Sequence, residues 1–398
     1  MANFNTLDDL GDIKDKVVFI RADLNVPAKG GVVSDTTRID RFVPTLKTLA
    51  DKEAKVIVAS HFGRPDGERK PDFSMAFLVP ELEKASGKKV RFVNDCIGPE
   101  VEAAVAEMKK GDILLLENLR FHKEEEANDP AFCQALAKGV DIYVNDAFST
   151  AHRAHASTAG MAQYIPVRVA GRLMQEELEA LDKALGNPVR PACALVGGSK
   201  VSTKLDLLGN LVKKVDYLLI GGGMAHTFLA AQGVAMGEGS LVEPSMIDTA
   251  KEILANAGNC KIVVPTDLVW ADEFAEGQEA HTAPVTELPA GKPLLDIGPL
   301  STAAFIDVIK QCKTLIWNGP VGAFEVKPFD TATNAIAAAV AELTKEEVLT
   351  SVAGGGDTVS ALKKAGVKKD LTYVSAAGGA FLEWMEGKQL PGVKVLEK

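Results

Sequence analysis

Two histidines and an arginine stand within four positions of one another in the stretch NDAFSTAHRAHAS, residues 145–157. They are His152, Arg153 and His155, and they follow an apolar run at 142–144 that predicts a buried strand. Open α/β sheets bind ligands beyond the carboxyl ends of their strands, so the cluster is a candidate anion site. A solvated basic loop is the alternative, and this stretch alone does not decide between them.

A second candidate follows the apolar run 17–20, in the motif RADLNVP. Arg21, Asp23 and Asn25 alternate there, so they would share one face of an extended segment and could hold an anionic ligand that also carries a hydroxyl. An ion pair between Arg21 and Asp23, or with a neighbouring residue, is the alternative.

Two more predicted strands end in basic motifs. The run VIVAS leads into SHFGRP, where His61 and Arg64 flank Gly63, and a glycine there permits a tight turn. The run 113–116 leads into LENLRFH, which supplies Arg120 and His122, while the acidic triplet at 124–126 is predicted to be solvated. The convergence of basic residues at strand ends is a stronger signal than any one of them.

A helix is predicted from residue 35, because Ile39, Phe42 and Leu46 belong to an apolar stripe at helical spacing. Arg38 lies at its start, where a cation opposes the helix dipole by a few tenths of a kcal/mol unless an anion compensates. That misfit indicates a function for Arg38.

The second half of the chain places glycine clusters after predicted strands: GGSKVSTK, GGGMAHTF, NGPVGAFE, GGGDT and AAGGA. Glycines between a strand and a helix let bare N–H groups approach phosphate oxygens. There is no GxxxxGK[ST], no GxGxxG and no HRD–DFG pair, so the P-loop, Rossmann and protein-kinase scaffolds are not supported.

Charged residues beside these glycines have two interpretations each. Asp357 in GGGDT is equally well explained as the N-cap of the following helix or as a Mg²⁺ ligand. Lys200 and Lys204 would share a helical face if a helix begins after the glycine turn, although surface lysines are the usual explanation for such a pair.

Composition excludes several classes of protein. The 398 residues predict about two to three domains, and the net charge of −10 gives no reason to expect binding to nucleic acid or membranes. Residues 1–16 contain no apolar signal-peptide core and no apolar span reaches membrane length, so a cytoplasmic protein is expected. Five cysteines without CxxC spacing predict reduced, buried thiols.

Ten motifs in this order carry a resemblance: RADLNVP, SHFGRP, LENLRFH, NDAFSTAHRAHAS, GGSKVSTK, IGGGMAHTF, LDIGP, WNGPVGAFE, GGGDT and a final LPG. Across nearly the whole chain the sequence resembles phosphoglycerate kinase. The resemblance implies an α/β fold of two similar-sized domains, each a mainly parallel sheet with flanking helices, facing a cleft and joined by a helix. The expected parts are 1–169 for 3-phosphoglycerate, a connecting helix at 170–187, 188–379 for the nucleotide, and a segment 380–398 that returns to the first domain.

The resemblance also implies site residues. Those expected to hold 3-phosphoglycerate or 1,3-bisphosphoglycerate are Arg21, Asp23, Asn25, Arg38, His61, Arg64, Arg120, His152 and Arg153. Those expected to hold Mg·ATP or Mg·ADP are Gly198, Lys204, Asn318, Pro320, Glu325, Gly354, Gly355, Gly356, Asp357 and Thr358, with Asp357 on Mg²⁺ and Glu325 near the ribose. Arg38, Lys200 and Lys204 would surround the phosphoryl group in flight, and a monomer is expected.

The implied chemistry suits these residue types. The nucleophile would be a carboxylate with a pKa of about 3.5 to 4, so no general base is needed at neutral pH. Transfer then requires in-line positioning and positive charge around the equatorial oxygens. Two half-sites on separate domains would require closure, so an open form is expected without ligands.

One loop departs from the family pattern. Similar proteins carry S-T-G-G-G-A where this chain has Ser375, Ala376, Ala377, Gly378, Gly379 and Ala380. The loop is expected to help bind the transferring phosphoryl group through Gly378 and Gly379. Its N–H donors survive an alanine only where φ stays negative, so we expect either a tolerable backbone or reduced turnover.

Two other functions compete with the kinase. A non-catalytic two-domain protein that closes on a phosphorylated metabolite would share the basic cluster but would have no use for GGGDT, Lys204 and Glu325. A nucleotide-dependent ligase acting through an acyl phosphate would need a site for an acceptor amine or thiol, and the sequence offers no candidate.

Overall fold

The computed structural model describes residues 4–398, which divide into two compact units. The N-terminal unit runs to Glu179 and includes the tail Gln389–Lys398, while the C-terminal unit is Ala180–Lys388. The tail that joins the N-terminal unit is therefore shorter than the expected 380–398. Helix α13 (Gly378–Met385) packs against α7 (Leu205–Leu211), which keeps it with the C-terminal unit.

The N-terminal unit contains a six-stranded parallel sheet. Its strands, in spatial order, are β5 (Val90–Val93), β6 (Ile113–Leu116), β4 (Lys55–Ala59), β1 (Val17–Ala22), β7 (Ile142–Asp146) and β8 (Val167–Ala170). Parallel strands are buried on both faces, which explains why they read as continuous apolar runs.

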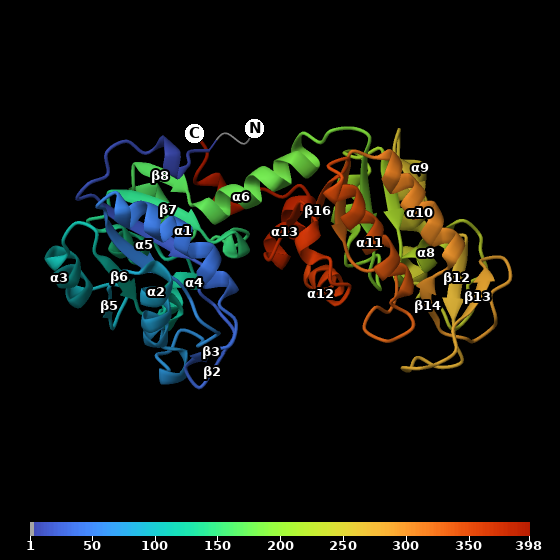
Figure 1. The fold of residues 1–398 in the computed structure, drawn as a ribbon, viewed down its shortest axis with the longest axis horizontal. Coiled ribbons are helices and arrows are strands. Elements are labelled where there is room, and N and C mark those ends of the chain that lie inside the picture. Colours follow the sequence, from blue (N-terminus) through green and yellow to red (C-terminus); the bar gives the residue numbers. More distant parts are fainter. Residues whose placement is uncertain (1–3) are drawn as a thin grey trace. The chain divides into compact units, whose positions relative to one another are not determined.

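The helices of this unit cover that sheet (Figure 1). Helices α1 (Thr37–Asp51) and α2 (Val79–Ser86) share one apolar core with β1, β4, β6 and β7. Helix α3 (Pro99–Glu107) packs against β5 and β6. The remaining elements are α4 (Lys123–Glu126), α5 (Pro130–Ala137), α14 (Pro391–Lys394) and the short hairpin of β2 (Ala28–Lys29) and β3 (Val32–Val33).

The C-terminal unit contains a second six-stranded parallel sheet. Its order is β11 (Lys261–Val263), β10 (Tyr217–Ile220), β9 (Ala192–Val196), β15 (Thr314–Asn318), β16 (Thr350–Ala353) and β17 (Tyr373–Val374). Helices α10 (Pro299–Gln311), α11 (Thr331–Lys345) and α12 (Gly356–Lys364) join its strands in one core, and the unit also contains α8 (Gly223–Ala231) and α9 (Ile247–Ala255). The predicted α/β class with two mainly parallel sheets is confirmed.

A three-stranded antiparallel sheet was not predicted. Strand β12 (Asp267–Trp270) pairs with β13 (His281–Pro284) and β14 (Leu294–Ile297). Its strands are four residues each and only partly buried, so they lack the long apolar runs of the main sheet. This small sheet supplies part of the wall of a pocket described below.

The connecting helix expected at 170–187 corresponds to α6 (Arg172–Leu181), followed by a π-helical turn, Asp182–Gly186. Asp146, at the end of β7, accepts hydrogen bonds from the N–H groups of Leu173 and Met174. It thereby supplies an acceptor for two N–H groups at the start of α6 that have no partner within the helix. A side chain at Gly171 would collide with that carboxylate, at 2.2 Å from its Oδ1, so the position requires glycine. All five cysteines are buried and free, as predicted.

Candidate active site

The carboxyl ends of neighbouring strands in the N-terminal unit enclose a hollow of about 260 Å³. Its lining comes from the segments after β1, β4, β6 and β7 and from the start of α1, and consists of Asp23, Asn25, Arg38, His61, Gly63, Arg64, Arg120, Ser149, Thr150 and Arg153. The structure therefore brings together seven of the nine residues expected at this site. The other two, Arg21 and His152, do not line the hollow.

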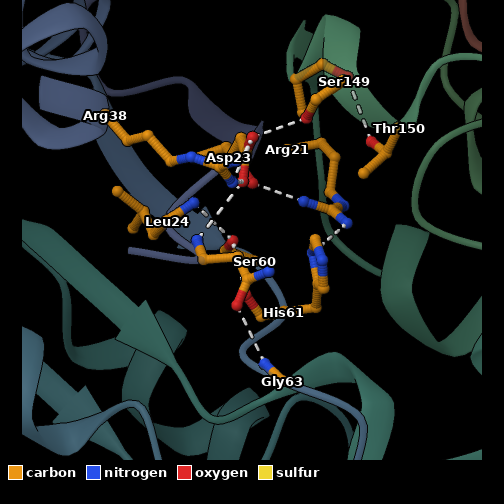
Figure 2. Close-up of polar contacts among 12 residues, drawn as sticks. Arg21, Asp23, Leu24, Arg38, Ser60, His61, Gly63, Ser149 and Thr150 are labelled. Atoms are coloured by element: carbon orange, nitrogen blue, oxygen red, sulfur yellow. Dashed lines mark hydrogen bonds and ion pairs between the residues drawn. The ribbon is translucent and has the colours of Figure 1, made fainter. Parts of the chain in front are cut away.

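Asp23 and Arg38 form the ion pair of this pocket. Arg38 Nη1 donates to both carboxylate oxygens of Asp23, at 2.6 and 2.8 Å, and Ser149 Oγ donates to Oδ2 at 2.5 Å (Figure 2). An Arg21–Asp23 pair, one alternative from the sequence, is wrong, and the neighbouring partner is Arg38. Asp23 also supplies the anion that a cation at the start of α1 requires.

Arg21 lies behind the pocket. Its side chain is buried, with 1% of the residue exposed. Nε donates to Ser157 Oγ at 2.8 Å, Nη2 donates to His61 Nδ1 at 3.1 Å, and Nη1 donates to the carbonyl of Ala22. From the alternation with Asp23 and Asn25 we predicted that Arg21 faces a ligand, but its guanidinium donates to Ser157, Ala22 and His61 instead.

The turn after β4 is fixed by a glycine and an arginine. Gly63 has φ +63°, and a Cβ there would lie 2.3 Å from the ring of Phe73. Its carbonyl accepts from Arg120 Nη1 at 3.0 Å, and its N–H donates to Asn25 Oδ1 at 3.0 Å. The buried Arg120 is thus held in place, whereas the neighbouring Arg64 is exposed.

Positive charge dominates this pocket. Four arginines line it, and among the described lining residues Asp23 alone carries a carboxylate. Burial, reinforced by the charges of Arg21, Arg120, Arg38 and Arg153, holds the pKa of His61 well below its usual value, so His61 is neutral at pH 7. An anion with several acceptor oxygens suits this arrangement.

The histidines of the stretch 152–155 do not line the pocket. His152 Nε2 accepts from Arg153 Nε at 3.3 Å. Burial and then nearby arginines lower the pKa of His155 to about 4, so it adds no positive charge at pH 7. Glu125, predicted to be solvated, is fully buried, and burial raises the pKa of its carboxyl.

The C-terminal unit has a hollow of about 380 Å³ at the glycine-rich ends of its strands. Apolar side chains form much of its wall, including Leu241, Leu268, Phe274, Leu294 and Phe324. The lining also includes Gly198, Pro320 and the carboxylates of Glu325 and Asp357, and both of these acidic residues are exposed. An apolar wall beside bare N–H groups suits a nucleobase with attached phosphates.

Lys204 lies beside this hollow. Its Nζ donates to the carbonyl of Gly197 at 2.7 Å and to Asn318 Oδ1 at 2.6 Å. A Cβ at Gly197 would come within 1.9 Å of the carbonyl oxygen of Pro320, so glycine allows these two turns to approach. Lys204 precedes α7, so the idea that it shares a helical face with Lys200 is wrong, and Lys200 is exposed and outside the lining.

Two of the residues expected to contact the nucleotide form hydrogen bonds between the glycine turns. Asn318 Nδ2 donates to the carbonyl of Gly354 at 2.9 Å, and Thr358 Oγ1 accepts from the N–H of Gly319 at 2.7 Å. The lining does not include Asn318, Gly354, Gly355, Gly356 or Thr358.

Asp357 is the second residue of α12. The N-cap position belongs to Gly355, at φ +96°, and no side chain caps this helix. The N-cap interpretation of Asp357 is therefore wrong. Asp357 is thus an exposed carboxylate at the rim of the hollow. It lies in the first turn of α12, where the helix dipole favours a negative charge.

The loop that departs from the family pattern keeps an ordinary backbone. Ala377 has φ −102°, and its N–H donates to Ser375 Oγ at 3.2 Å.

We expect Ala377→Gly to leave kcat unchanged within about twofold, because the alanine forces no strained conformation. A larger rise in kcat, measured by steady-state kinetics, would show that the departure weakens catalysis. Ala376→Thr, which restores the family's hydroxyl, is the companion variant.

Both pockets contain residues that were not predicted from the sequence. Ser149 was within the quoted stretch 145–157 but was not singled out, and a hydroxyl in the loop that follows a strand gives no distinctive signal. The apolar wall residues Leu268 and Leu294 come from the antiparallel sheet that was not predicted. A search for clustered apolar residues would not have separated them from core residues.

Comparisons with known proteins agree on one family. A family model described as phosphoglycerate kinase matches residues 7–388. A phosphoglycerate kinase from Sinorhizobium fredii is 58% identical over 397 residues, covering 99% of both chains, and one from Rhizorhabdus wittichii is 58% identical over 396 residues, also covering 99% of both. Two solved structures are also similar to this chain. Phosphoglycerate kinase from Coxiella burnetii has a TM-score of 0.92 and 41% sequence identity, with 99% of this chain and 98% of that chain covered. Phosphoglycerate kinase from Pyrococcus horikoshii has a TM-score of 0.78 and 29% identity, with 98% of each chain covered. No helix within residues 4–398 is long and apolar enough to span a membrane.

Proposed function

The chain belongs to the phosphoglycerate kinase family, and from that premise we propose how its residues divide the work of the reaction. The reaction is the reversible transfer of a phosphoryl group between ATP and the carboxylate of 3-phosphoglycerate, giving ADP and 1,3-bisphosphoglycerate. One observation carries the proposal: four arginines and a neutral histidine converge on one hollow, while the other unit has a glycine-lined hollow with an apolar wall.

Phosphoglycerate binds in the N-terminal pocket. Its phosphate and carboxylate pair with Arg64, Arg120 and Arg153, because arginine presents paired donors that match these groups. Asp23 and Asn25 supply oxygens that accept from the substrate hydroxyl. Arg21 and His152, outside the lining, support this site from behind.

The nucleotide binds in the C-terminal pocket. Its base lies against the apolar wall, which includes Leu241 and Leu294, and Glu325 accepts from the ribose hydroxyls. The bare N–H groups of the turns at Gly198 and 355–356 approach the phosphates, while the N–H of Gly354 donates to the carbonyl of Trp317 and holds the turn. Asn318 and Thr358 keep these turns in register through the hydrogen bonds described above.

Mg²⁺ fits this donor set. Asp357 is an exposed carboxylate at the rim of the nucleotide pocket and makes no capping bond, and magnesium held with nucleotide phosphates usually takes only one or two protein carboxylates. When bound, magnesium neutralises charge on the nucleotide phosphates. Asp357 would hold it.

Positive charge around the moving phosphoryl group comes from both units. Arg38 leaves Asp23 to contact an equatorial oxygen, and Lys204 leaves its carbonyl and amide acceptors to contact another. Lys200, on an exposed segment, supplies a further cation, and the first N–H groups of α13, at Gly378 and Gly379, act as neutral donors. The substrate carboxylate is already ionised, so the protein supplies no base.

The proposal is tested by trapping the product. Purified protein is incubated with Mg·ATP and 3-phosphoglycerate, and hydroxylamine converts acyl phosphate into a hydroxamate that is measured by its iron complex. Trapped product supports the kinase. Binding of both ligands without product would favour the non-catalytic alternative.

Asp357→Asn is expected to raise the KM for Mg·ATP by about tenfold or more, because the neutral amide is a poor magnesium ligand. The measurement is the initial rate as a function of free Mg²⁺ at fixed ATP, where the variant should need more Mg²⁺ for half-maximal rate. Asp330→Asn, outside the lining of this pocket, is the matched control. An unchanged magnesium dependence would remove Asp357 from the metal site.

We further propose a monomer acting in the cytoplasm. Each pocket is built from this one chain, and the substrates are soluble phosphorylated metabolites. Sedimentation velocity at assay concentrations checks the oligomeric state, with a single species near 42 kDa expected.

A further inference from the structure

Behind the phosphoglycerate pocket lies a buried polar network that the proposed reaction does not use. It runs from Glu125 through Ser157 and Arg21 to His61, the only one of the four that lines the hollow among the described residues. Glu125, Ser157 and Arg21 are each no more than 1% exposed. A network buried this deeply is expected to fix the groups at its ends.

The contact between Arg21 and His61 determines a proton position. A guanidinium has five N–H donors and no acceptor. Nη2 of Arg21 lies 3.1 Å from His61 Nδ1, so Nδ1 must be the unprotonated, accepting nitrogen (Figure 2). The neutral ring then carries its proton on Nε2.

We propose that Arg21 is a positioning residue that holds His61 as the Nε2–H tautomer, which makes His61 a neutral hydrogen-bond donor to the bound phosphoglycerate. This inference rests on the proposed function for the identity of the ligand, but not for the tautomer. It also gives Arg21, which does not line the hollow, a defined role.

The rest of the network explains why Arg21 keeps this position. Ser157 Oγ accepts from Arg21 Nε and donates to Glu125 Oε1 at 2.5 Å, and the N–H of Ser157 donates to Glu125 Oε2 at 2.9 Å. Tyr143 donates its hydroxyl to the carbonyl of Ser157 at 2.8 Å. Glu125 thus offers the buried counter-charge for Arg21, and the intervening serine is fixed by four hydrogen bonds.

A neutral donor adds something that the surrounding arginines do not. Arg38, Arg120 and Arg153 attract any anion over a range of positions, whereas one N–H in a fixed ring is directional. Burial and the same arginines lower the pKa of His61, so the ring stays neutral and keeps this tautomer at pH 7. The donor therefore orients the substrate without adding to the crowded positive charge.

The first test measures the tautomer directly in the wild-type protein. Histidine is labelled with ¹⁵N on the ring, the His61 signals are assigned by their loss in His61→Gln, and two-bond ¹⁵N–¹H correlation identifies the protonated nitrogen. The expected result is a proton on Nε2 and none on Nδ1 at pH 7, before any ligand is added. A proton on Nδ1, or an imidazolium, overturns the proposal whatever the protein catalyses.

The second test asks whether Arg21 acts through His61. A glutamine side chain places its amide near the position of Nε2, and an asparagine places it near Nδ1. We expect the Kd for 3-phosphoglycerate to stay within about threefold of wild type in His61→Gln and to rise by about tenfold or more in His61→Asn, as for the loss of a hydrogen bond to a charged group. Equal losses in both variants contradict a donor at Nε2.

Arg21→Lys completes a double-mutant cycle, since it keeps the charge but loses the fork of donors. Calorimetric Kd values should rise about tenfold in the wild-type background and much less in His61→Gln, where no tautomer needs fixing. Equal effects in both backgrounds would mean that Arg21 is merely structural. The Kd for Mg·ATP should not change, and circular dichroism confirms folding. If Arg21→Lys does not fold, the NMR measurement of the tautomer and the comparison of His61→Gln with His61→Asn still test the proposal.

Discussion

Replacing Arg38 with alanine is expected to lower kcat by about three orders of magnitude or more. An arginine that stabilises charge on a transferring phosphoryl group contributes roughly 10³ to 10⁵ in rate. This guanidinium is paired with Asp23 at 2.6 Å, yet its side chain remains 36% exposed, so it is held at the pocket and is accessible from it. The KM for Mg·ATP should change little, because Arg38 belongs to the N-terminal pocket.

The measurement is hydroxamate formation by wild type and variant at saturating substrates. Lys47→Ala is the matched control, because it also removes one positive charge from α1 but at an exposed position outside the pocket. Arg38→Lys should recover only part of the rate, since a lysine lacks the planar fork. A kcat within tenfold of wild type for Arg38→Ala would exclude this arginine from the transfer step.

The location of the N-terminal site was predictable because it depends on local patterns. Continuous apolar runs predict parallel strands, and the carboxyl ends of parallel strands meet at one edge of the sheet. His61, Arg120 and Arg153 each lie in the segment that follows such a run, so the sequence predicts their convergence, and the hollow that they line confirms it.

The direction of each side chain was less predictable. Arg21 and Asp23 alternate, yet Arg21 turns into the core and Asp23 into the pocket, because β1 ends at Ala22 and the alternation ends with it. Glu125 was predicted to be exposed because it lies among glutamates, but the buried charge of Arg21 provides a reason to bury it. Both outcomes depend on partners more than 30 residues away in sequence, Ser157 among them.

In the pocket of the C-terminal unit, the glycines were predictable from the sequence, whereas the apolar wall was not. Gly197 and Gly319 allow the turns after β9 and β15 to approach so closely that a Cβ on either would collide with backbone. That requirement is visible in the sequence as glycine clusters. The wall residues Leu268 and Leu294 come from β12 and β14, whose short, half-buried strands have no periodic signature.

Lys204→Met is expected to lower kcat by about 10² to 10³, since it removes a cation that the proposal places on the phosphoryl group. The wild-type enzyme should also lose kcat/KM for Mg·ATP as the pH rises through about 8. Burial lowers the pKa of Lys204 to about 8, and the charge of Asp357 only partly opposes this. Above that pH the free enzyme holds a neutral amine, which cannot pair with a phosphate.

Lys204→Arg separates charge from titration. A guanidinium stays protonated across this pH range, so the variant should be slower than wild type. Its kcat/KM for Mg·ATP should not decline between about pH 7.5 and 9.5, a range that includes the lysine pKa.

The lowered pKa of Lys204 also predicts a pH dependence of stability. The folded state binds fewer protons at Lys204 than the unfolded state between about pH 8 and 10.4, so wild type should gain stability relative to Lys204→Met across that window. An alkaline decline that persists in Lys204→Arg would assign the titration to another group. Lys204 would then stay charged above pH 8, because the carbonyl of Gly197 and the side-chain oxygen of Asn318 accept from its ammonium in place of water.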